Sequence, residues 1–135
     1  MVIDSSAIIA ILLGESDAAR LTEAIAGAAK RLMSAFSLLE CGIVIETKKG
    51  ESGGRELDLF IHKSKTQIIA LRPEHVEIAR EAYRKFGKGR HPAGLNIGDA
   101  CSYALAVFSG EPLLYKGGDF SRTDVRSADS ASAVE

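Results

Sequence analysis

The chain has 135 residues, of which 46% are apolar and 26% are charged, and its formal net charge is −1. These values are typical of one globular domain with a core of its own, and the small net charge argues against a protein that coats nucleic acid. No apolar run approaches the roughly 20 residues that cross a bilayer, and no basic region precedes an apolar stretch at the N-terminus. We therefore expect a cytoplasmic protein without a membrane anchor, in which Cys41 and Cys101 stay reduced.

Short apolar runs alternate with longer amphipathic segments along the chain. The pattern predicts strands at residues 1–4, 31–34, 67–71 and 112–115, with a last short strand near Val125. It predicts helices at residues 5–13, 16–28, 35–49, 73–86 and 98–107, and another helix that begins at residues 53–54. Ser5 or Ser6 is the expected cap of the first helix.

Strands that alternate with helices indicate an α/β fold. We predict one domain over residues 1–126, in which helices cover both faces of a central parallel sheet of about four to five strands. The small polar residues 127–135 are expected to form a flexible C-terminal tail. Ligand sites in such sheets lie at the carboxyl ends of the strands, so the residues that follow each strand are the first candidates for function.

Four acidic residues stand where an acid is either costly or well placed for chemistry. Asp4 ends the first strand, Glu40 lies inside the apolar run 36–45, Asp99 begins an apolar helix, and Asp119 lies in a glycine turn after the last long strand. Each acid also has an ordinary explanation on its own. Asp4 could cap a helix, Glu40 could form a salt bridge, Asp99 could be stabilised by the helix dipole, and Asp119 could be an ordinary turn residue. If the four converge, their repulsion would raise their pKa values or require a cation.

A divalent metal ion is the simplest partner for such a set, and phosphodiester chemistry is the simplest use of that ion. Mg²⁺ prefers oxygen ligands, takes few protein carboxylates and keeps several waters. A water bound to the metal becomes a better nucleophile, and a nearby carboxylate can accept its proton. Zinc is not indicated, because His62, His75 and His91 are scattered along the chain rather than spaced as ligands.

Four short motifs contain these acids and follow one another in order. They are Val-Ile-Asp-Ser-Ser at the start, Ser-Leu-Leu-Glu in the third helix, Gly-Leu-Asn-Ile-Gly-Asp-Ala before the last long helix, and Leu-Leu-Tyr-Lys-Gly-Gly-Asp-Phe near the end. In this order they resemble the PIN-domain ribonucleases, and most closely the VapC toxins of bacterial toxin–antitoxin pairs. The resemblance covers roughly residues 1–126 and implies that the single domain has a PIN-like fold.

The resemblance implies an endoribonuclease that uses Mg²⁺, or Mn²⁺, to activate the water that cleaves an RNA phosphodiester, leaving a 5′-phosphate and a 3′-hydroxyl. The residues that it assigns to catalysis and metal binding are Asp4, Glu40, Asp99 and Asp119, with Ser6 and Asn96 in support. We expect Asp4 and Asp99 to hold the first metal, and the other two acids to complete its shell, partly through water. Glu40 is the expected proton acceptor, because partial burial raises the pKa of a carboxyl group.

The same resemblance implies a homodimer and a VapB-type antitoxin whose C-terminal segment blocks the site. We expect this segment to insert an Arg or Lys into the acidic pocket. The chain has no ribbon-helix-helix or other DNA-binding stretch, so it would bind operator DNA only through the antitoxin. The residues expected to bind the RNA backbone are Lys88, Arg90, His91 and Lys116. Transfer, ribosomal and messenger RNA all stay open as substrates, because loop shape would select among them.

Three other functions share parts of this pattern. A phosphotransfer receiver domain has an acidic pocket on a parallel sheet, but it needs an acid after its third strand, where this chain has Arg72 and Pro73. A cyclic-dinucleotide cyclase carries a motif like Gly-Gly-Asp-Phe, but that domain is longer and has a second acid. A catalytically silent module that acts through its antitoxin complex stays open, and metal-dependent RNA cleavage would separate it from an enzyme.

Overall fold

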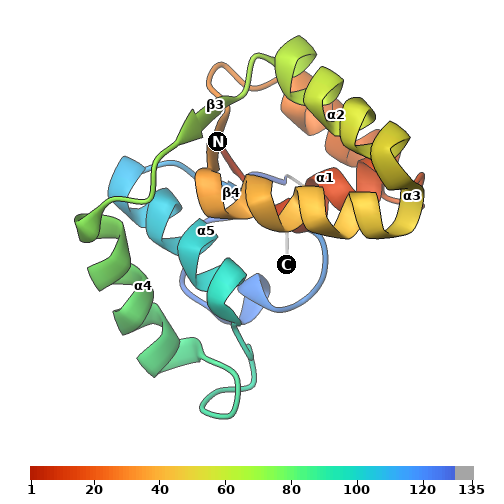
Figure 1. Ribbon diagram of the computed structural model, residues 1–135. Helices are drawn as coiled ribbons and strands as arrows, with labels where there is room; N and C mark the ends of the chain where they lie inside the picture. Colours follow the sequence, from red (N-terminus) through yellow and green to blue (C-terminus); the bar gives the residue numbers. More distant parts are fainter. Residues whose placement is uncertain (130–135) are drawn as a thin grey trace.

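Four short parallel strands form the centre of the molecule, in the order β3-β2-β1-β4 (Figure 1). This computed structural model describes residues 1–129. The strands are β1 (Val2–Ile3), β2 (Leu32–Ser34), β3 (Gln67–Ile69) and β4 (Leu113–Leu114). Val2 lies opposite Leu32 on one side and opposite Leu113 on the other. The predicted parallel sheet is therefore confirmed.

Helices cover both faces of this sheet. Within residues 1–129 the α-helices are α1 (Ser5–Leu12), α2 (Ala18–Ala26), α3 (Ala35–Ser64), α4 (Pro73–Phe86) and α5 (Ile97–Ser109), and a short 3-10 helix, η1 (Phe120–Arg122), follows β4. Figure 1 shows α1, α2 and α3 gathered on one side of the molecule and α4 and α5 on the other. In that part of the chain, no helix combines the length and the apolar character needed to cross a membrane.

Side chains of successive strand residues point to opposite faces of the sheet, and each face has its own core. The core beneath α1, α2 and α3 contains Ile3, Met33 and Leu114. The core beneath α4 and α5 contains Val2, Leu32 and Leu113. Burial of each such side chain stabilises the fold by roughly 1.5–3 kcal/mol. Because both faces are covered there, β1 and β4 consist of buried apolar residues only, whereas Gln67 and Ile68 of the edge strand β3 are exposed.

A kink at Gly50 divides α3 into two arms. Gly50 has φ 68° and ψ −161°, a backbone conformation that glycine adopts without the strain a side chain would add. The sequence predicted a break at this point, but α3 resumes directly after Gly50 rather than at residues 53–54. Gly53 lets the arms approach each other, because a Cβ there would lie 2.6 Å from Lys49 Cβ and 2.9 Å from Ile45 Cγ2.

Asp4 is the cap of α1, which corrects the expectation that Ser5 or Ser6 would fill this role. Its backbone is extended, with φ −78° and ψ 154°, and its side chain accepts a hydrogen bond from the backbone N–H of Ser6. The hydroxyl groups of the two serines make contacts elsewhere in the molecule. Asp4 therefore has the structural role of a helix cap that the sequence also suggested for it.

The segment after η1 returns to the edge of the sheet. Leu113 forms an isolated bridge with Ser127, and the backbone N–H of Ala128 donates to Leu113 O over 2.9 Å. Val125 belongs to no strand, which differs from the sequence expectation. The predicted tail thus begins with residues that pack beside β4, and its residues 130–135 lie outside the described part of the chain. Its flexibility stays a prediction.

Candidate active site

Four elements deliver the predicted acids to one end of the sheet. Asp4 directly follows β1, Glu40 lies in the second turn of α3, Asp99 lies in the first turn of α5, and Asp119 immediately precedes η1. Burial raises the pKa of Asp99, and the negative charges of Asp4, Asp119 and Glu40 raise it further, so each of these three acids lies within electrostatic reach of Asp99. The structure therefore brings together the four acids that the sequence singled out.

Asp4 is the most deeply buried member of the cluster, with 2% of its surface exposed. Burial raises the pKa of Asp4, because a charged carboxylate is poorly solvated inside the protein, whereas hydrogen bonds from Ser102 and Ser6 lower it. Ser102 Oγ donates to Asp4 Oδ1 over 2.5 Å, and the backbone N–H of Ser6 donates to Oδ2 over 3.0 Å. Each oxygen of this carboxylate thus accepts a hydrogen bond from the protein.

Glu40 is positioned by a serine and by a glycine. Ser5 Oγ donates to Glu40 Oε1 over 2.7 Å. A Cβ at Gly98 would lie 2.6 Å from both carboxylate oxygens of Glu40, so this side chain rests directly on the first turn of α5, where the helix dipole favours a negative charge. The salt bridge that would explain Glu40 on its own is not formed with any basic group among residues 1–129.

Asn96 and Asp99 form a reciprocal cap at the start of α5. Asn96 Oδ1 accepts a hydrogen bond from the backbone N–H of Asp99 over 2.9 Å, and Asp99 Oδ2 accepts one from the backbone N–H of Asn96 over 3.0 Å. Burial, followed by the neighbouring acids, raises the pKa of Asp99 to about 6. Asp99 is therefore the second acid of the cluster, after Asp4, whose pKa is raised.

Asp119 lies in an exposed turn that is anchored on both sides. Before it, the backbone N–H of Lys116 donates to Ser6 Oγ over 3.0 Å. After it, Phe120 is buried and packs against Tyr115 with ring centroids 5.1 Å apart. Ser6 therefore supports the site by holding the turn that carries Asp119 against the start of α1.

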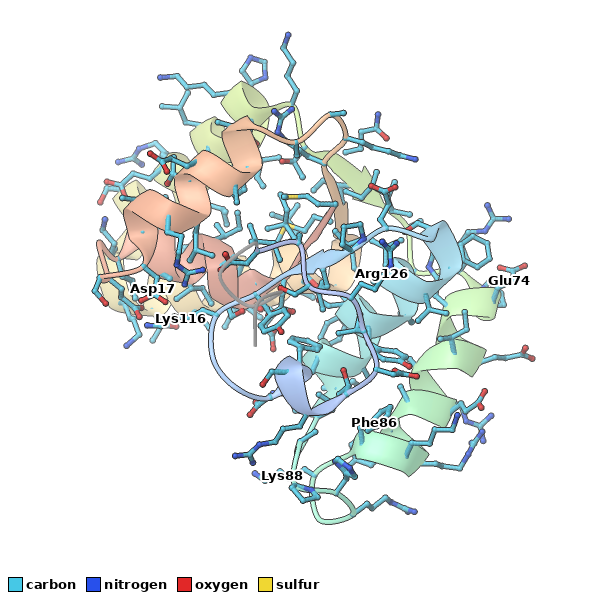
Figure 2. The ribbon with its side chains drawn as sticks, turned by 180° about the vertical axis from the view of Figure 1, so that it is seen from behind. Asp17, Glu74, Phe86, Lys88, Lys116 and Arg126 are labelled. Atoms are coloured by element: carbon cyan, nitrogen blue, oxygen red, sulfur yellow. The ribbon has the colours of Figure 1, made fainter. Side chains whose placement is uncertain are left out.

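The basic residues expected to bind RNA do not form one patch. Lys88 and Arg90 are exposed on the loop after α4, and neither forms an ion pair within the described part of the chain. Lys116 lies well apart from Lys88 in Figure 2, and its Nζ pairs with Glu15. The loop therefore offers two cationic groups, whereas the ammonium group of Lys116 is already engaged.

His91 braces the basic loop. Its Nδ1 accepts a hydrogen bond from the backbone N–H of Ala93 over 3.0 Å. Its ring meets Phe86 at the end of α4 edge-on, with ring centroids 5.2 Å apart. These two contacts give His91 a structural part in shaping the loop that presents Lys88 and Arg90.

The donor set of the cluster fits a hard divalent cation. All its donors are carboxylate oxygens, and none of the acids pairs with a basic group among residues 1–129. No three His, Cys, Asp or Glu side chains of those residues are grouped closely enough to hold a metal ion by themselves. Mg²⁺ does not need such a group, because it is commonly held by one or two carboxylates together with waters and substrate phosphates.

Sequence reasoning missed the residues that support the acids, which are Ser5, Ser37, Ser102 and Gly98. A signal existed for two of them. Ser37 lies three residues before Glu40, and Ser102 lies three residues after Asp99, a spacing that puts both members of each pair on one helix face. The contacts of Glu40 with Ser5 and Gly98 join distant segments, so only the fold reveals them.

Known proteins resemble this chain over nearly its whole length. The family model of the PIN domain matches residues 1–126. Ribonuclease VapC of Mycolicibacterium smegmatis is 54% identical over 125 residues, which cover 93% of this chain and 97% of that protein. Ribonuclease VapC30 of Mycobacterium tuberculosis is 52% identical over 125 residues, which cover 93% of this chain and 95% of that protein.

Solved structures resemble the fold at much lower identity. VapC20 of Mycobacterium tuberculosis, described as a toxin that cleaves the sarcin–ricin loop, has a TM-score of 0.76 at 16% identity, covering 92% of this chain and 95% of that one. VapBC2 from Rickettsia felis, bound to a DNA fragment from its promoter, has a TM-score of 0.71 at 17% identity, covering 93% and 94%. At such identities the likeness extends to the fold alone.

Replacing Asp99 by Asn is expected to stabilise the metal-free protein at neutral pH. Folding raises the pKa of Asp99 from 3.8 to about 6, so the folded state favours the protonated acid. This contribution to stability is present below about pH 4 and is lost as the pH rises through about 6. Asn keeps an acceptor for the Asn96 N–H but carries no charge. Allowing for solvent screening, we expect Asp99→Asn to raise the free energy of unfolding by about 1 kcal/mol near neutral pH and to leave it unchanged near pH 4.

Urea unfolding in EDTA at both pH values measures this difference. Asp58→Asn, at an exposed position of α3, is the matched control and is expected to show no such dependence on pH. An equal effect of Asp99→Asn at both pH values would contradict the assignment of the raised pKa to Asp99.

Proposed function

Because this chain belongs to the PIN-domain family, and within it to the VapC ribonucleases, we propose that it is the toxin of a toxin–antitoxin pair and cuts RNA at its acidic cluster. The observation that carries this proposal is the convergence of Asp4, Glu40, Asp99 and Asp119 at one end of the sheet. An acidic cluster without a basic partner is suited to a cation rather than to a structural ion pair.

We assign cation binding to Asp4 and Asp99, with Glu40 and Asp119 reaching the ion partly through water. Mg²⁺ is the expected ion and Mn²⁺ a substitute, because both accept a set of oxygen ligands. When bound, such an ion stabilises charge on the phosphoryl oxygens and makes water a better nucleophile. A cation beside Asp99 also favours its ionised form, which offsets the repulsion that raises its pKa.

Glu40 is the group that we propose to take the proton of the attacking water. Ser5 holds its Oε1, so Oε2 is the atom available to accept that proton. The water oxygen bonds to phosphorus while the bond from phosphorus to the 3′-oxygen breaks, and the departing 3′-oxygen takes up a proton from solvent. The products are a 5′-phosphate and a 3′-hydroxyl, and no 2′-hydroxyl is needed as a nucleophile.

Lys88 and Arg90 are the residues that we propose to hold the RNA backbone, since both are exposed, neither pairs with an acid among residues 1–129, and His91 stabilises their loop. Lys116 would contribute only after leaving Glu15. We propose the cytoplasm as the place of action, because the proposed substrate is RNA and both cysteines of the chain are free and buried.

The purified, antitoxin-free protein is expected to fragment total RNA in Mg²⁺ but not in EDTA. Asp4→Asn and Asp99→Asn should each lower the cleavage rate at least about 100-fold, because each removes a negative charge from the cation site. Asp58→Asn is the matched control and should cleave at the wild-type rate. Sequencing of the fragment ends would identify the RNA that is cut. Absence of cleavage by folded wild-type protein in Mg²⁺ would favour the catalytically silent binding module.

We also propose that an antitoxin blocks the acidic cluster with an Arg or Lys. Carboxylates held close together favour any cation, and a guanidinium group can bind two carboxylate oxygens at once. VapBC2 of Rickettsia felis shares this fold and is bound to a DNA fragment from its promoter, and we propose that this chain contacts operator DNA only through its antitoxin.

An inhibitory antitoxin segment is expected to lose at least about 100-fold in affinity when all its basic residues are replaced by Gln, because the carboxylates then lose their charge partner. Inhibition of RNA cleavage by the two peptides measures the difference. A scrambled peptide of the same charge is the control for non-specific attraction. Equal inhibition by the native and the Gln-substituted peptide would contradict the proposed mode of blocking.

We propose that the chain forms a homodimer through the groove between α4 and α5. The groove has a volume of about 780 Å³, and its lining includes Leu71, Val76, Tyr83 and Ile97. These side chains are between 37% and 67% exposed. A contiguous set of large, exposed apolar side chains typically marks an interface, and a two-fold dimer would bury the same groove on both copies.

Val76→Glu is expected to weaken the dimer at least about 100-fold, because the two-fold axis places one buried, unpaired charge on each side of the interface. Val107→Glu is the matched control, since Val107 is 49% exposed on α5 and lies outside the lining of the groove. Sedimentation equilibrium of wild type and both variants measures the dissociation constants. A dimer that tolerates Val76→Glu as well as Val107→Glu would rule out this face.

A further inference from the structure

Two buried serines lie behind Asp4, and we propose that they are positioning residues that fix its carboxylate for cation binding. The inference rests on the proposed function, because it concerns the cation site of that function. Ser102 Oγ donates to Asp4 Oδ1 over 2.5 Å, and Ser37 Oγ lies 3.0 Å from Ser102 Oγ. Both serines are fully buried. Together they form a line of hydroxyl groups, the serine line, that runs from α3 through α5 to the end of β1.

The hydrogen atoms of the serine line have one consistent order when Asp4 is ionised. A carboxylate only accepts hydrogen bonds, so Ser102 uses its single hydroxyl hydrogen on Asp4. Ser37 is then the donor in its contact with Ser102. Each bond polarises the next along such a line, and the bond that ends on a charged carboxylate is the strongest of them.

Packing alone does not account for a hydroxyl group at position 102. The buried positions of α5 around it are occupied by residues without a hydroxyl-bearing aliphatic side chain, and three of them are alanines, Ala100, Ala104 and Ala106. Alanine at position 102 would fill nearly the same volume and has the higher helix propensity. A buried hydroxyl group costs free energy unless it is hydrogen-bonded, and its bond here goes to Asp4. The serine is therefore best explained by the carboxylate that it contacts.

The serine line also joins the elements that carry the other acids. Ser37 lies on α3 three residues before Glu40, and Ser102 lies on α5 three residues after Asp99. Its two contacts therefore help to set the spacing of α3, α5 and β1 at the cluster. Because the backbone N–H of Ser6 holds Oδ2, the carboxylate of Asp4 cannot rotate without losing a hydrogen bond. Partners that orient a metal ligand in this way commonly change metal affinity by about 10–100-fold.

Mn²⁺ binding to the purified full chain tests the inference independently of RNA cleavage. The EPR signal of free Mn²⁺ gives dissociation constants for wild type, Ser102→Ala and the control Ser109→Ala. Ser109 lies on the same helix, and its hydroxyl group donates to Leu105 O over 2.7 Å. We expect Ser102→Ala to weaken Mn²⁺ binding about 10-fold, and Ser109→Ala to leave it within about twofold of wild type.

Ser37→Ala tests whether Ser37 acts on Asp4 through Ser102, or whether the contact between Ser102 and Asp4 matters alone. In the wild-type background it is expected to weaken Mn²⁺ binding by about twofold to threefold, because Ser102 loses a polarising donor. In the Ser102→Ala background it is expected to have no further effect, since the intermediate hydroxyl group is gone. Equal effects of Ser37→Ala in both backgrounds would overturn the coupling.

The outcomes for Mn²⁺ binding distinguish this inference from the proposed function. If wild type and Ser102→Ala bind Mn²⁺ equally tightly, the serines do not position Asp4, and the proposed function stands. Urea unfolding in EDTA would then show whether Ser102 contributes to stability alone. If wild type does not bind Mn²⁺, the cation site of the proposed function fails, and this inference fails with it.

Discussion

The structure depends on one costly arrangement, the burial of the Asp4 carboxylate at the end of the central strand. A charged group inside a protein is unfavourable unless hydrogen bonds replace its hydration, and burial accordingly raises the pKa of Asp4. The replacement comes from the backbone N–H of Ser6 at the start of α1 and from the hydroxyl group of Ser102 on α5. One side chain therefore fixes a strand end and two helices, and the other acids take their places on or next to these elements.

The local, structural roles of the acids and their proposed chemical roles coincide. Asp4 caps α1, Asp99 shares a reciprocal cap with Asn96 on α5, and Glu40 rests against the first turn of the same helix. Helix N-termini stabilise negative charge, so they allow several carboxylates to approach one another at lower cost. The repulsion that remains contributes to the pKa of about 6 at Asp99. A divalent cation would relieve it, which links the architecture of the helix starts to the proposed metal dependence.

The acidic cluster lies at the carboxyl edge of the sheet, and the helices provide surfaces for the proposed partners. Fold alone does not decide function, because many activities share one architecture. For this chain, close sequence relatives over nearly its full length and the acidic cluster together support the proposed function. The exposed apolar groove between α4 and α5 adjoins the basic loop after α4, because Lys88 of that loop also lines the groove; we assign the groove to the proposed dimer and the exposed loop to the proposed RNA contact.

The sequence by itself determined the order of strands and helices, the break at Gly50, the start of α4 at Pro73 and the four acids. Each of these follows from residues that are neighbours in the chain, where spacing and capping are local properties. Tertiary structure alone decided which carboxyl group has a pKa of about 6, which carboxylate rests against Gly98, and which serines hold the acids. Ser102 and Asp4 are 98 positions apart, yet they share a hydrogen bond. The burial and the electrostatic energy of a group depend on all the atoms that surround it. Many of those atoms come from segments that are distant in the sequence, and local sequence patterns do not show that such segments are in contact.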